Sequence, residues 1–227
     1  SGVMVAAKSD RAHAGLSALF AAHDIERTYV ALTRGAPSPE KGRIQTQIGR
    51  SSGDRKKMAV LRSGGREAIT DYVVQQTFGR PAKASNAPLA ARVACTLHTG
   101  RTHQIRVHMA SRGAPLLGDP VYGSGSLAAP VRAAVEAAGL KRQALHAAVL
   151  GFIHPVTGQA LRFETAPPAD MRRLEALLAE ICAASQRGAL FATTSVLDKG
   201  TTATHRSPPE WDNPPLSFRA TDSHLVS

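Results

Sequence analysis

Short segments in which apolar and polar residues alternate recur through most of this chain, and they constrain its fold more than any other feature. The alternation has the period of strands that expose one face of a sheet to solvent. Glycine and proline separate the segments, and the stretch Pro155-Val-Thr-Gly158 is typical of a hairpin turn. The segments are 3–7, 27–32, 68–77, 92–97, 143–154 and 160–164. We therefore expect an α+β domain with a mixed, mainly antiparallel sheet and flanking helices.

Two segments have helical periodicity instead. In the first, Leu16, Leu19 and Phe20 share one helical face, and Ser9 or Asp10 can cap the helix that carries them. The second segment carries an apolar stripe with the spacing of core residues, which closes the domain. The stripe consists of Met171, Leu174, Leu177, Leu178 and Ile181.

Composition changes near residue 188. Residues 189–227 are rich in Ser, Thr and Pro, show weak periodicity and contain the single tryptophan, Trp211. Such composition cannot easily bury a core. We expect a domain over residues 1–188 and a disordered or extraneous tail over residues 189–227.

The chain is strongly basic. Lys and Arg number 28 against 17 Asp and Glu, which gives a formal net charge of +11. The excess lies within residues 1–188, because residues 189–227 hold three basic and four acidic side chains. A surface of this sign attracts polyanions, and contacts from Arg and Lys to phosphate dominate nucleic-acid affinity. Charge alone does not distinguish a nucleic-acid-binding protein from one that is basic for unrelated reasons.

Much of this charge lies in one expected loop, residues 50–66, where Asp54 is the single acidic residue. The basic residues are Arg50, Arg55, Lys56, Lys57, Arg62 and Arg66. A charge run is often only a solvated face, but unbalanced charge on a glycine-containing loop favours contact with a phosphate backbone. A second expected loop covers residues 33–43, which contain two glycines and two prolines.

The segment from His98 to His108 has the pattern of a turn that leads into a helix. Thr102 can cap a helix that runs to about Ser111, and Gly113 can supply the left-handed residue that stops it.

This helix start can hold an anion. Arg101 and His103 lie where free N–H groups and the helix dipole favour negative charge. Arg106 lies one turn further along, where a guanidinium can bind a carboxylate or phosphate through two hydrogen bonds.

Other chemistries have less support. His98, His103 and His108 are five residues apart, which does not place them on one helical face, and we expect no metal site. Glycine-rich nucleotide-binding motifs and the Gly-x-Ser-x-Gly elbow do not occur. The two cysteines, Cys95 and Cys182, have neither metal spacing nor a disulfide pattern, which favours a reducing compartment. With no long apolar run, we expect no membrane association and a location in the cytoplasm.

Five ordered motifs resemble those of one enzyme family. They are GRTHQIRVHM at 100–109, GDPVYG at 118–123, RQALHA at 142–147, HPVTG at 154–158 and APPAD at 166–170. The stretch RTYVAL at 27–32 also resembles the family's tyrosine motif. The chain thus resembles the RluA family of RNA pseudouridine synthases, and most of all its RluD-type branch, over residues 1 to about 184.

The resemblance implies an isomerase that detaches the base of a uridine, turns it and rejoins it to the sugar through carbon. The family needs no cofactor and no metal. It flips the target uridine into a pocket where an aspartate attacks or assists at the sugar. The implied partner is large-subunit ribosomal RNA, and we expect the protein to act as a monomer.

The resemblance also assigns individual residues. Tyr29 matches the tyrosine expected to stack on the flipped base, and Leu150 matches the apolar wall behind it; from the residues alone, both are compatible with an ordinary strand core. Arg106 matches the arginine expected to pair with the catalytic aspartate and to keep it ionised. Asp119 and Tyr122 lie in a turn and are expected to be structural. The expected RNA contacts are Arg101, His103, Gln104, Arg50, Arg55, Lys56 and Lys57.

The chain departs from the family pattern at Ser1. The catalytic aspartate belongs to the motif His-Arg-Leu-Asp-x-x-Thr-Ser-Gly, and Ser1-Gly2 matches only its end. We expect the aspartate just before Ser1, because Asp10 and Asp71 lie at unrelated positions. The expected function is therefore a pseudouridine synthase that is N-terminally truncated and inactive as written. The alternatives are an inactive RNA-binding fragment and a structural ribosome-associated protein.

Overall fold

One antiparallel sheet organises the molecule. The computed structural model describes residues 1–54, 57–79 and 87–194, with side chains through Ile181. Within these residues seven strands follow the order β3-β2-β4-β5-β1-β6-β7, and every neighbouring pair is antiparallel. The strands are β1 (Glu26–Arg34), β2 (Lys41–Arg50), β3 (Met58–Leu61), β4 (Arg66–Phe78), β5 (Ala90–Leu97), β6 (Leu145–Ile153) and β7 (Ala160–Glu164). The expected α+β class with a mainly antiparallel sheet is confirmed.

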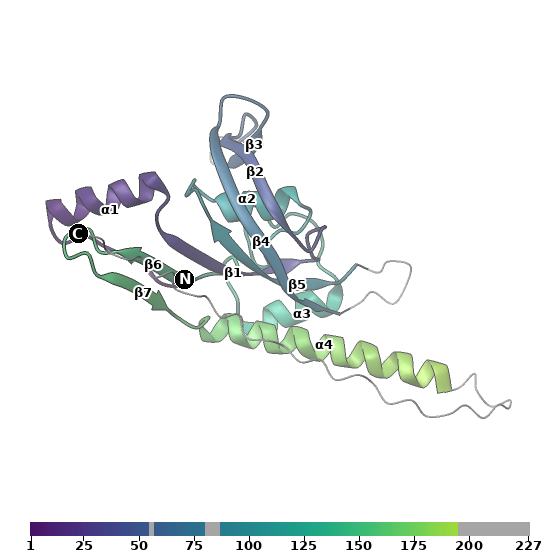
Figure 1. Ribbon diagram of the computed structural model, residues 1–227. Coiled ribbons are helices and arrows are strands. Elements are labelled where there is room, and N and C mark those ends of the chain that lie inside the picture. The colour runs from purple at the N-terminus through teal and green to yellow at the C-terminus, as the bar shows by residue number, and fades with distance from the viewer. Residues whose placement is uncertain (55–56, 80–86, 195–227) are drawn as a thin grey trace, which may run out of the picture.

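Four helices flank the sheet in the described part of the chain. They are α1 (Asp10–Ala22), α2 (Gln104–Ser111), α3 (Ala129–Ala138) and α4 (Ala169–Thr194). Figure 1 shows α3 and α4 packed along one edge of the molecule, α1 near β6 and β7, and α2 against the end that carries β3 and β4. No helix among the described residues combines the length and the apolar composition that crossing a membrane requires.

Separate apolar clusters hold the helices on the sheet. The α3 and α4 cluster is centred on Leu32, Phe78 and Leu174, all of which are fully buried. The cluster beneath α2 includes Ile44, Tyr72, Val93, Ile105 and Met109. A third cluster packs α1 against strand β6 through Leu16, Ile25, Leu150 and Phe152. Burial of this kind contributes roughly 25 cal/mol per Å² of apolar area.

Several sequence predictions hold at the level of single elements. Ser9 caps α1, and its side chain accepts a hydrogen bond from the N–H of Ala12 at 3.3 Å. Strands β6 and β7 form the predicted hairpin. Helix α2 ends at Ser111 as predicted, and Gly113 has the left-handed φ of 73°.

Others are wrong. Residues 3–7 form no strand; Gly2 makes only an isolated bridge with Ala147. The expected loop over 50–66 contains strand β3, which pairs with β2. The expected loop over 33–43 is shorter, because β1 continues to Arg34 and β2 begins at Lys41.

The structure describes only the first residues of the expected tail, 189–194. Helix α4 continues past Gly188 to Thr194, because a helix held by an apolar stripe can extend beyond its packed turns. The remainder of the tail, residues 195–227, lies outside the described residues.

Candidate active site

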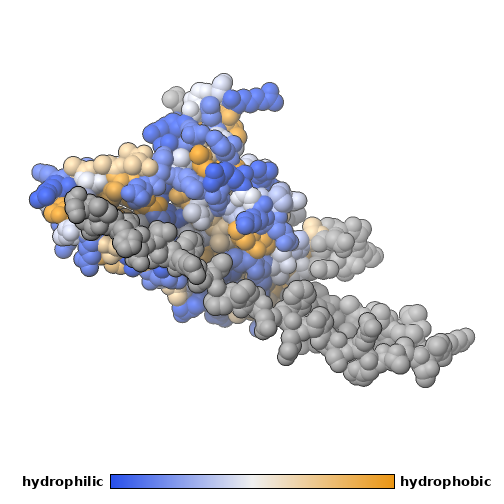
Figure 2. All heavy atoms as spheres, viewed as in Figure 1, coloured by the Kyte–Doolittle hydropathy of each residue, from blue (hydrophilic) through white to orange (hydrophobic). Residues whose placement is uncertain are grey.

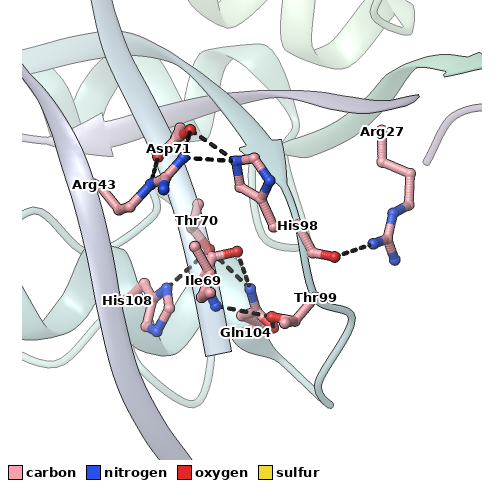
Figure 3. A network of polar contacts seen from close by, with 9 residues as sticks. All are labelled: Arg27, Arg43, Ile69, Thr70, Asp71, His98, Thr99, Gln104 and His108. Carbon is pink, nitrogen blue, oxygen red and sulfur yellow. Dashed lines mark hydrogen bonds and ion pairs between the residues drawn. The ribbon is translucent and has the colours of Figure 1, made fainter. Parts of the chain in front are cut away.

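A buried glutamine fixes the turn that precedes α2. The Oε1 atom of Gln104 accepts hydrogen bonds from Thr99 Oγ1 at 2.8 Å and from the Arg101 N–H at 2.9 Å. Its Nε2 atom donates to the Ile69 carbonyl at 3.0 Å and to Thr70 Oγ1 at 2.9 Å. Gln104 thus attaches the turn to strand β4, and Figure 3 shows its contacts with Thr99, Ile69 and Thr70. The four bonds also use all the bonding groups of the Gln104 side chain, which is 3% exposed, so this side chain shapes the turn and does not face RNA.

The start of α2 differs from the prediction that Thr102 caps it. The N-cap residue is His103, which has the left-handed φ of 57° and no side-chain capping bond. Its Nδ1 atom lies 3.0 Å from the hydroxyl of Tyr122, and that hydroxyl accepts a hydrogen bond from the N–H of Met58 at 2.9 Å. Burial, followed by the charge of Arg106, lowers the pKa of His103. The imidazole is therefore held neutral beside a hydrogen-bonded tyrosine.

The carboxylate partner of Arg106 lies within this chain. Nε and Nη2 of Arg106 donate to the two oxygens of Asp119, each at 2.8 Å. Asp119 also accepts from the N–H groups of Val121 and Tyr122, at 2.9 and 3.0 Å. The guanidinium lies over the Tyr122 ring, 4.8 Å from its centroid.

This pairing corrects the expectation that Arg106 holds a carboxylate outside the chain. The Gly118-Asp-Pro turn delivers Asp119 to that position, so the structural role expected for Asp119 fits what is observed. Burial favours the neutral carboxyl, but the hydrogen bonds from Arg106, Tyr122 and Val121 outweigh it and lower the pKa of Asp119. The hydrogen bond to Asp119 raises the pKa of Arg106. Both groups are ionised.

Tyr29 and Leu150 line one small cavity of about 140 Å³ between β1, β6 and the start of the chain. Its other lining residues are Val3, Met4, Val5, Phe20, Arg27, Ala147 and Val149. Burial raises the pKa of the Tyr29 phenol, which therefore stays protonated at neutral pH. The structure thus brings together two of the three residues assigned by the resemblance, whereas Arg106 does not line this cavity.

Sequence reasoning missed Arg27. Arg27 lies two residues before Tyr29 on β1, so both side chains leave the same face of the strand. In the pairing of β1 with β6, Arg27 is opposite Leu150. Its Nη2 atom donates to the His98 carbonyl at 2.9 Å, which links β1 to the turn before α2 (Figure 3). An arginine within the apolar stretch RTYVAL was the available signal, because a buried charge requires a partner.

A second, wider cavity of about 340 Å³ opens at the start of α2. Its lining residues are Ile48, Arg50, Met58, Arg66, Gly100, Arg101, Thr102 and His103. Three predicted RNA contacts, Arg50, Arg101 and His103, therefore meet in one place, and Arg66 joins them. Hydrophilic residues cover much of the face around β2 and β3 that is visible in Figure 2. This cavity has the charge to receive a phosphate.

Of the other predicted RNA contacts within the described residues, neither Gln104 nor Lys57 lines this cavity. Lys57 lies 3.8 Å from Asp54 in an exposed ion pair. Arg55 and Lys56 lie outside the described residues.

A buried histidine behind the turn completes the arrangement. His108 is fully buried; Nδ1 lies 2.9 Å from Thr70 Oγ1 and Nε2 lies 2.9 Å from Thr46 Oγ1. Burial, followed by the charge of Arg112, lowers the pKa of His108 to about 4, so it is neutral near pH 7.

Groups of three or more His, Cys, Asp or Glu side chains arranged to hold a metal do not occur among the described residues.

At the surface next to this turn, Asp71 joins Arg43 and His98. Arg43 Nε donates to Asp71 at 2.6 Å, and His98 Nε2 lies 2.7 Å from the other carboxylate oxygen (Figure 3). The hydrogen bond from Arg43 lowers the pKa of Asp71 to about 2. An exposed pair of this kind contributes little to stability.

Comparison with known proteins identifies relatives of this chain. The family model described as RNA pseudouridylate synthase matches residues 1–111. Ribosomal large subunit pseudouridine synthase D of Zymomonas mobilis is 47% identical over 179 residues, covering 78% of this chain and 53% of that protein. RNA pseudouridine synthase 2, chloroplastic, of Arabidopsis thaliana is 41% identical over 78% of this chain and 44% of its own length.

The fold has matches among solved structures as well. Human RNA Pseudouridylate Synthase Domain Containing 1 superposes with a TM-score of 0.54 at 26% identity, covering 71% of this chain and 62% of that chain. This chain spans about half the length of the curated relatives it matches. Motif order, the cavity with Tyr29 and Leu150, and these similarities agree: the chain belongs to the RNA pseudouridylate synthases, in the RluA family and of the RluD type.

Proposed function

We propose that residues 1–188 form the catalytic domain of an enzyme that isomerises uridine to pseudouridine in large-subunit ribosomal RNA. The observation that carries the proposal is the small cavity lined by Tyr29 and Leu150, together with the basic cavity at the start of α2. The named substrate of the Zymomonas mobilis relative, the large ribosomal subunit, supports this choice of RNA.

The small cavity suits a flipped base. A base outside its helix loses stacking, and an aromatic ring in the pocket restores about 1–3 kcal/mol of it. Tyr29 supplies that ring, and its raised pKa keeps the phenol uncharged against the base. Leu150, which is 6% exposed, provides an apolar wall that excludes water.

The basic cavity suits the RNA backbone. Arg50, Arg66 and Arg101 converge there, and Arg101 is held in place by a 2.8 Å bond from its Nε atom to the Glu67 carbonyl. Arginines at a helix start combine their own charge with free N–H groups. In this proposal they position the strand, while the small cavity selects the base.

The isomerisation requires a group that assists at the sugar. The bond from N1 of uracil to C1′ breaks, the base turns and a bond from C5 to C1′ forms. The hydrogen on C5 leaves to solvent as a proton, and N1 takes up a proton. None of the described residues that line the small cavity carries a carboxylate. We propose that the aspartate of the family motif is supplied immediately upstream of Ser1.

The position of Ser1 suits that supply. Its amino group donates to the Leu145 carbonyl at 3.3 Å, and its hydroxyl lies 3.1 Å from His146 Nδ1. Gly2 bridges to Ala147, which lines the cavity and lies opposite Tyr29 across the β1–β6 pair. A segment that precedes Ser1 therefore starts beside the wall of the cavity.

Release of tritium from ribosomal RNA labelled at C5 of uridine tests the proposal. We expect no release from the chain that begins at Ser1, and release once the family segment His-Arg-Leu-Asp-x-x-Thr precedes it. The matched control carries Asn in place of the Asp of that segment. Release by the chain that begins at Ser1 would show that the upstream aspartate is not required. Absence of release from the extended chain would favour an RNA-binding protein without this chemistry.

A further inference from the structure

Arg27 is the most unusual charged residue of the described chain. It is 6% exposed, and its Nη2 atom makes one hydrogen bond, to the His98 carbonyl. Its Nε atom is the one buried side-chain nitrogen or oxygen in the described residues that has no hydrogen-bond partner. A buried donor left without a partner costs about 1–3 kcal/mol, and more on a charged group.

The charge of Arg27 is also unbalanced. Among the described residues, no carboxylate oxygen lies within 4.0 Å of its guanidinium. The guanidinium carbon lies over the Phe20 ring, 5.5 Å from its centroid. Burial lowers the pKa of Arg27; Tyr29 opposes this effect, and the like charge of Arg101 adds a smaller lowering. Buried charges are normally paired, so an anion from outside this part of the chain fits here.

The guanidinium lies where the two cavities meet. Arg27 lines the small cavity together with Tyr29 and Leu150. Its Nη1 atom approaches Gly100 so closely that a Cβ added there would stand 2.8 Å away. Gly100 lines the basic cavity. Figure 3 shows the side chain extending from β1 toward the turn that carries His98 and Thr99.

A nucleotide whose base enters the small cavity must pass this junction with its sugar and phosphate. We propose that Arg27 binds a phosphodiester group that flanks the target uridine, and so couples backbone binding to base capture. The planar fork of a guanidinium matches two phosphate oxygens, and Nε is the donor that such a fork requires. The inference rests on the proposed function and adds a substrate-binding residue to it.

The test uses a short single-stranded RNA with one uridine. In two further RNAs, the phosphodiester on one side of that uridine is replaced by an uncharged methylphosphonate. Fluorescence anisotropy gives the Kd of each RNA for the wild-type chain and for Arg27→Gln and Arg27→Lys. The matched control is Arg172→Gln, which removes one exposed charge from α4.

We expect Arg27→Gln to weaken binding of the unmodified RNA by roughly tenfold, and Arg172→Gln to change it much less. One methylphosphonate should weaken wild-type binding by a similar factor. The same replacement should have little further effect on Arg27→Gln, since the two changes remove the same contact. Arg27→Lys should retain part of the affinity, because it keeps the charge without the fork.

Gly100→Ala keeps the test decisive if Arg27→Gln does not fold. Gly100 has no positive φ, so alanine fits the backbone and its Cβ displaces the end of Arg27. This variant should show the same loss of sensitivity to methylphosphonate.

If folded Arg27→Gln binds as tightly as the wild type, or stays as sensitive to each methylphosphonate, the proposal is wrong. The first result is also expected if the anion is a protein carboxylate. Either outcome leaves the proposed isomerase activity standing, because tritium release by the extended chain tests that separately.

Discussion

Arg106 and Asp119 join α2 to the turn after it through two hydrogen bonds, both 2.8 Å long, with the carboxylate side chain completely buried. The pair closes a loop of the chain and holds Tyr122, whose hydroxyl reaches His103 and Met58. One ion pair thus fixes one side of the basic cavity. Its removal should affect stability first and RNA binding second.

Asp119→Ala should lower the free energy of unfolding by about 3–5 kcal/mol, because it leaves the Arg106 charge buried without a partner. Urea denaturation measures this loss. The control is Asp71→Ala, which breaks an ion pair whose side chains are 55% and 37% exposed. That change should cost at most about 1 kcal/mol. Equal losses from the two variants would contradict the structural role assigned to the buried pair.

His108 should make stability fall as pH decreases. Its pKa is lowered to about 4 in the folded protein from an ordinary value of 6.5. Between these two pH values the unfolded chain binds a proton that the folded chain does not, so the free energy of unfolding decreases as pH falls. The contribution ends below about pH 4. Denaturation at a series of pH values should show this slope.

His108→Gln should flatten the slope, because it removes the titrating group. His13→Gln, at an exposed position of α1, is the control and should leave the slope in place. The Asp71 carboxyl, with its pKa lowered to about 2 from 3.8, destabilises the fold on protonation only at lower pH. An unchanged slope in His108→Gln would assign the pH dependence to another group.

Tyr29→Ala should weaken binding of uridine-containing RNA by about 1–3 kcal/mol, the contribution of one stacked base. Tyr29→Phe keeps the ring and should bind nearly as well as the wild type. The same RNA with an abasic site in place of the uridine should bind equally to all three proteins. A loss of equal size in Tyr29→Phe would indicate that the hydroxyl, not the ring, contacts RNA.

Gly118→Ala should destabilise the protein more than Gly139→Ala. Both glycines are left-handed, with φ of 68° and 69°, so alanine costs about 1–2 kcal/mol of backbone strain at either position. A Cβ at Gly118 would also overlap the carbonyl oxygen of Arg142, whereas nothing lies within 4 Å of one at Gly139. Thermal unfolding compares the two. Similar losses would show that the turn carrying Asp119 can shift.

The strands were predictable where alternation and turn residues coincide, as in the β6–β7 hairpin. Strand β3 was missed because its four residues, Met58–Leu61, lie among basic residues and depend on pairing with β2. The strand expected over residues 3–7 was wrong because alternation cannot show that only Gly2 finds a partner.

Candidate site residues could be named from the sequence, but their pairings could not. Tyr29 and Leu150 line the same cavity, and their roles there stay a prediction. The partner of Arg106 could not be read from the sequence, because the Gly118 turn, and not helical spacing, brings Asp119 to it. Arg27 was missed because its importance comes from burial, which depends on strands and a turn far apart in the chain.

The position of β1 within the sheet has a consequence for synthesis. β1 lies between β5 and β6, so its second edge is covered only by residues 145–153. A ribosome that has not yet released those residues leaves that edge of β1 open, and open strand edges are templates for aggregation. The wall that carries Leu150 is therefore completed late, and the cavity that Tyr29 and Leu150 line cannot form before residues 145–153 have emerged.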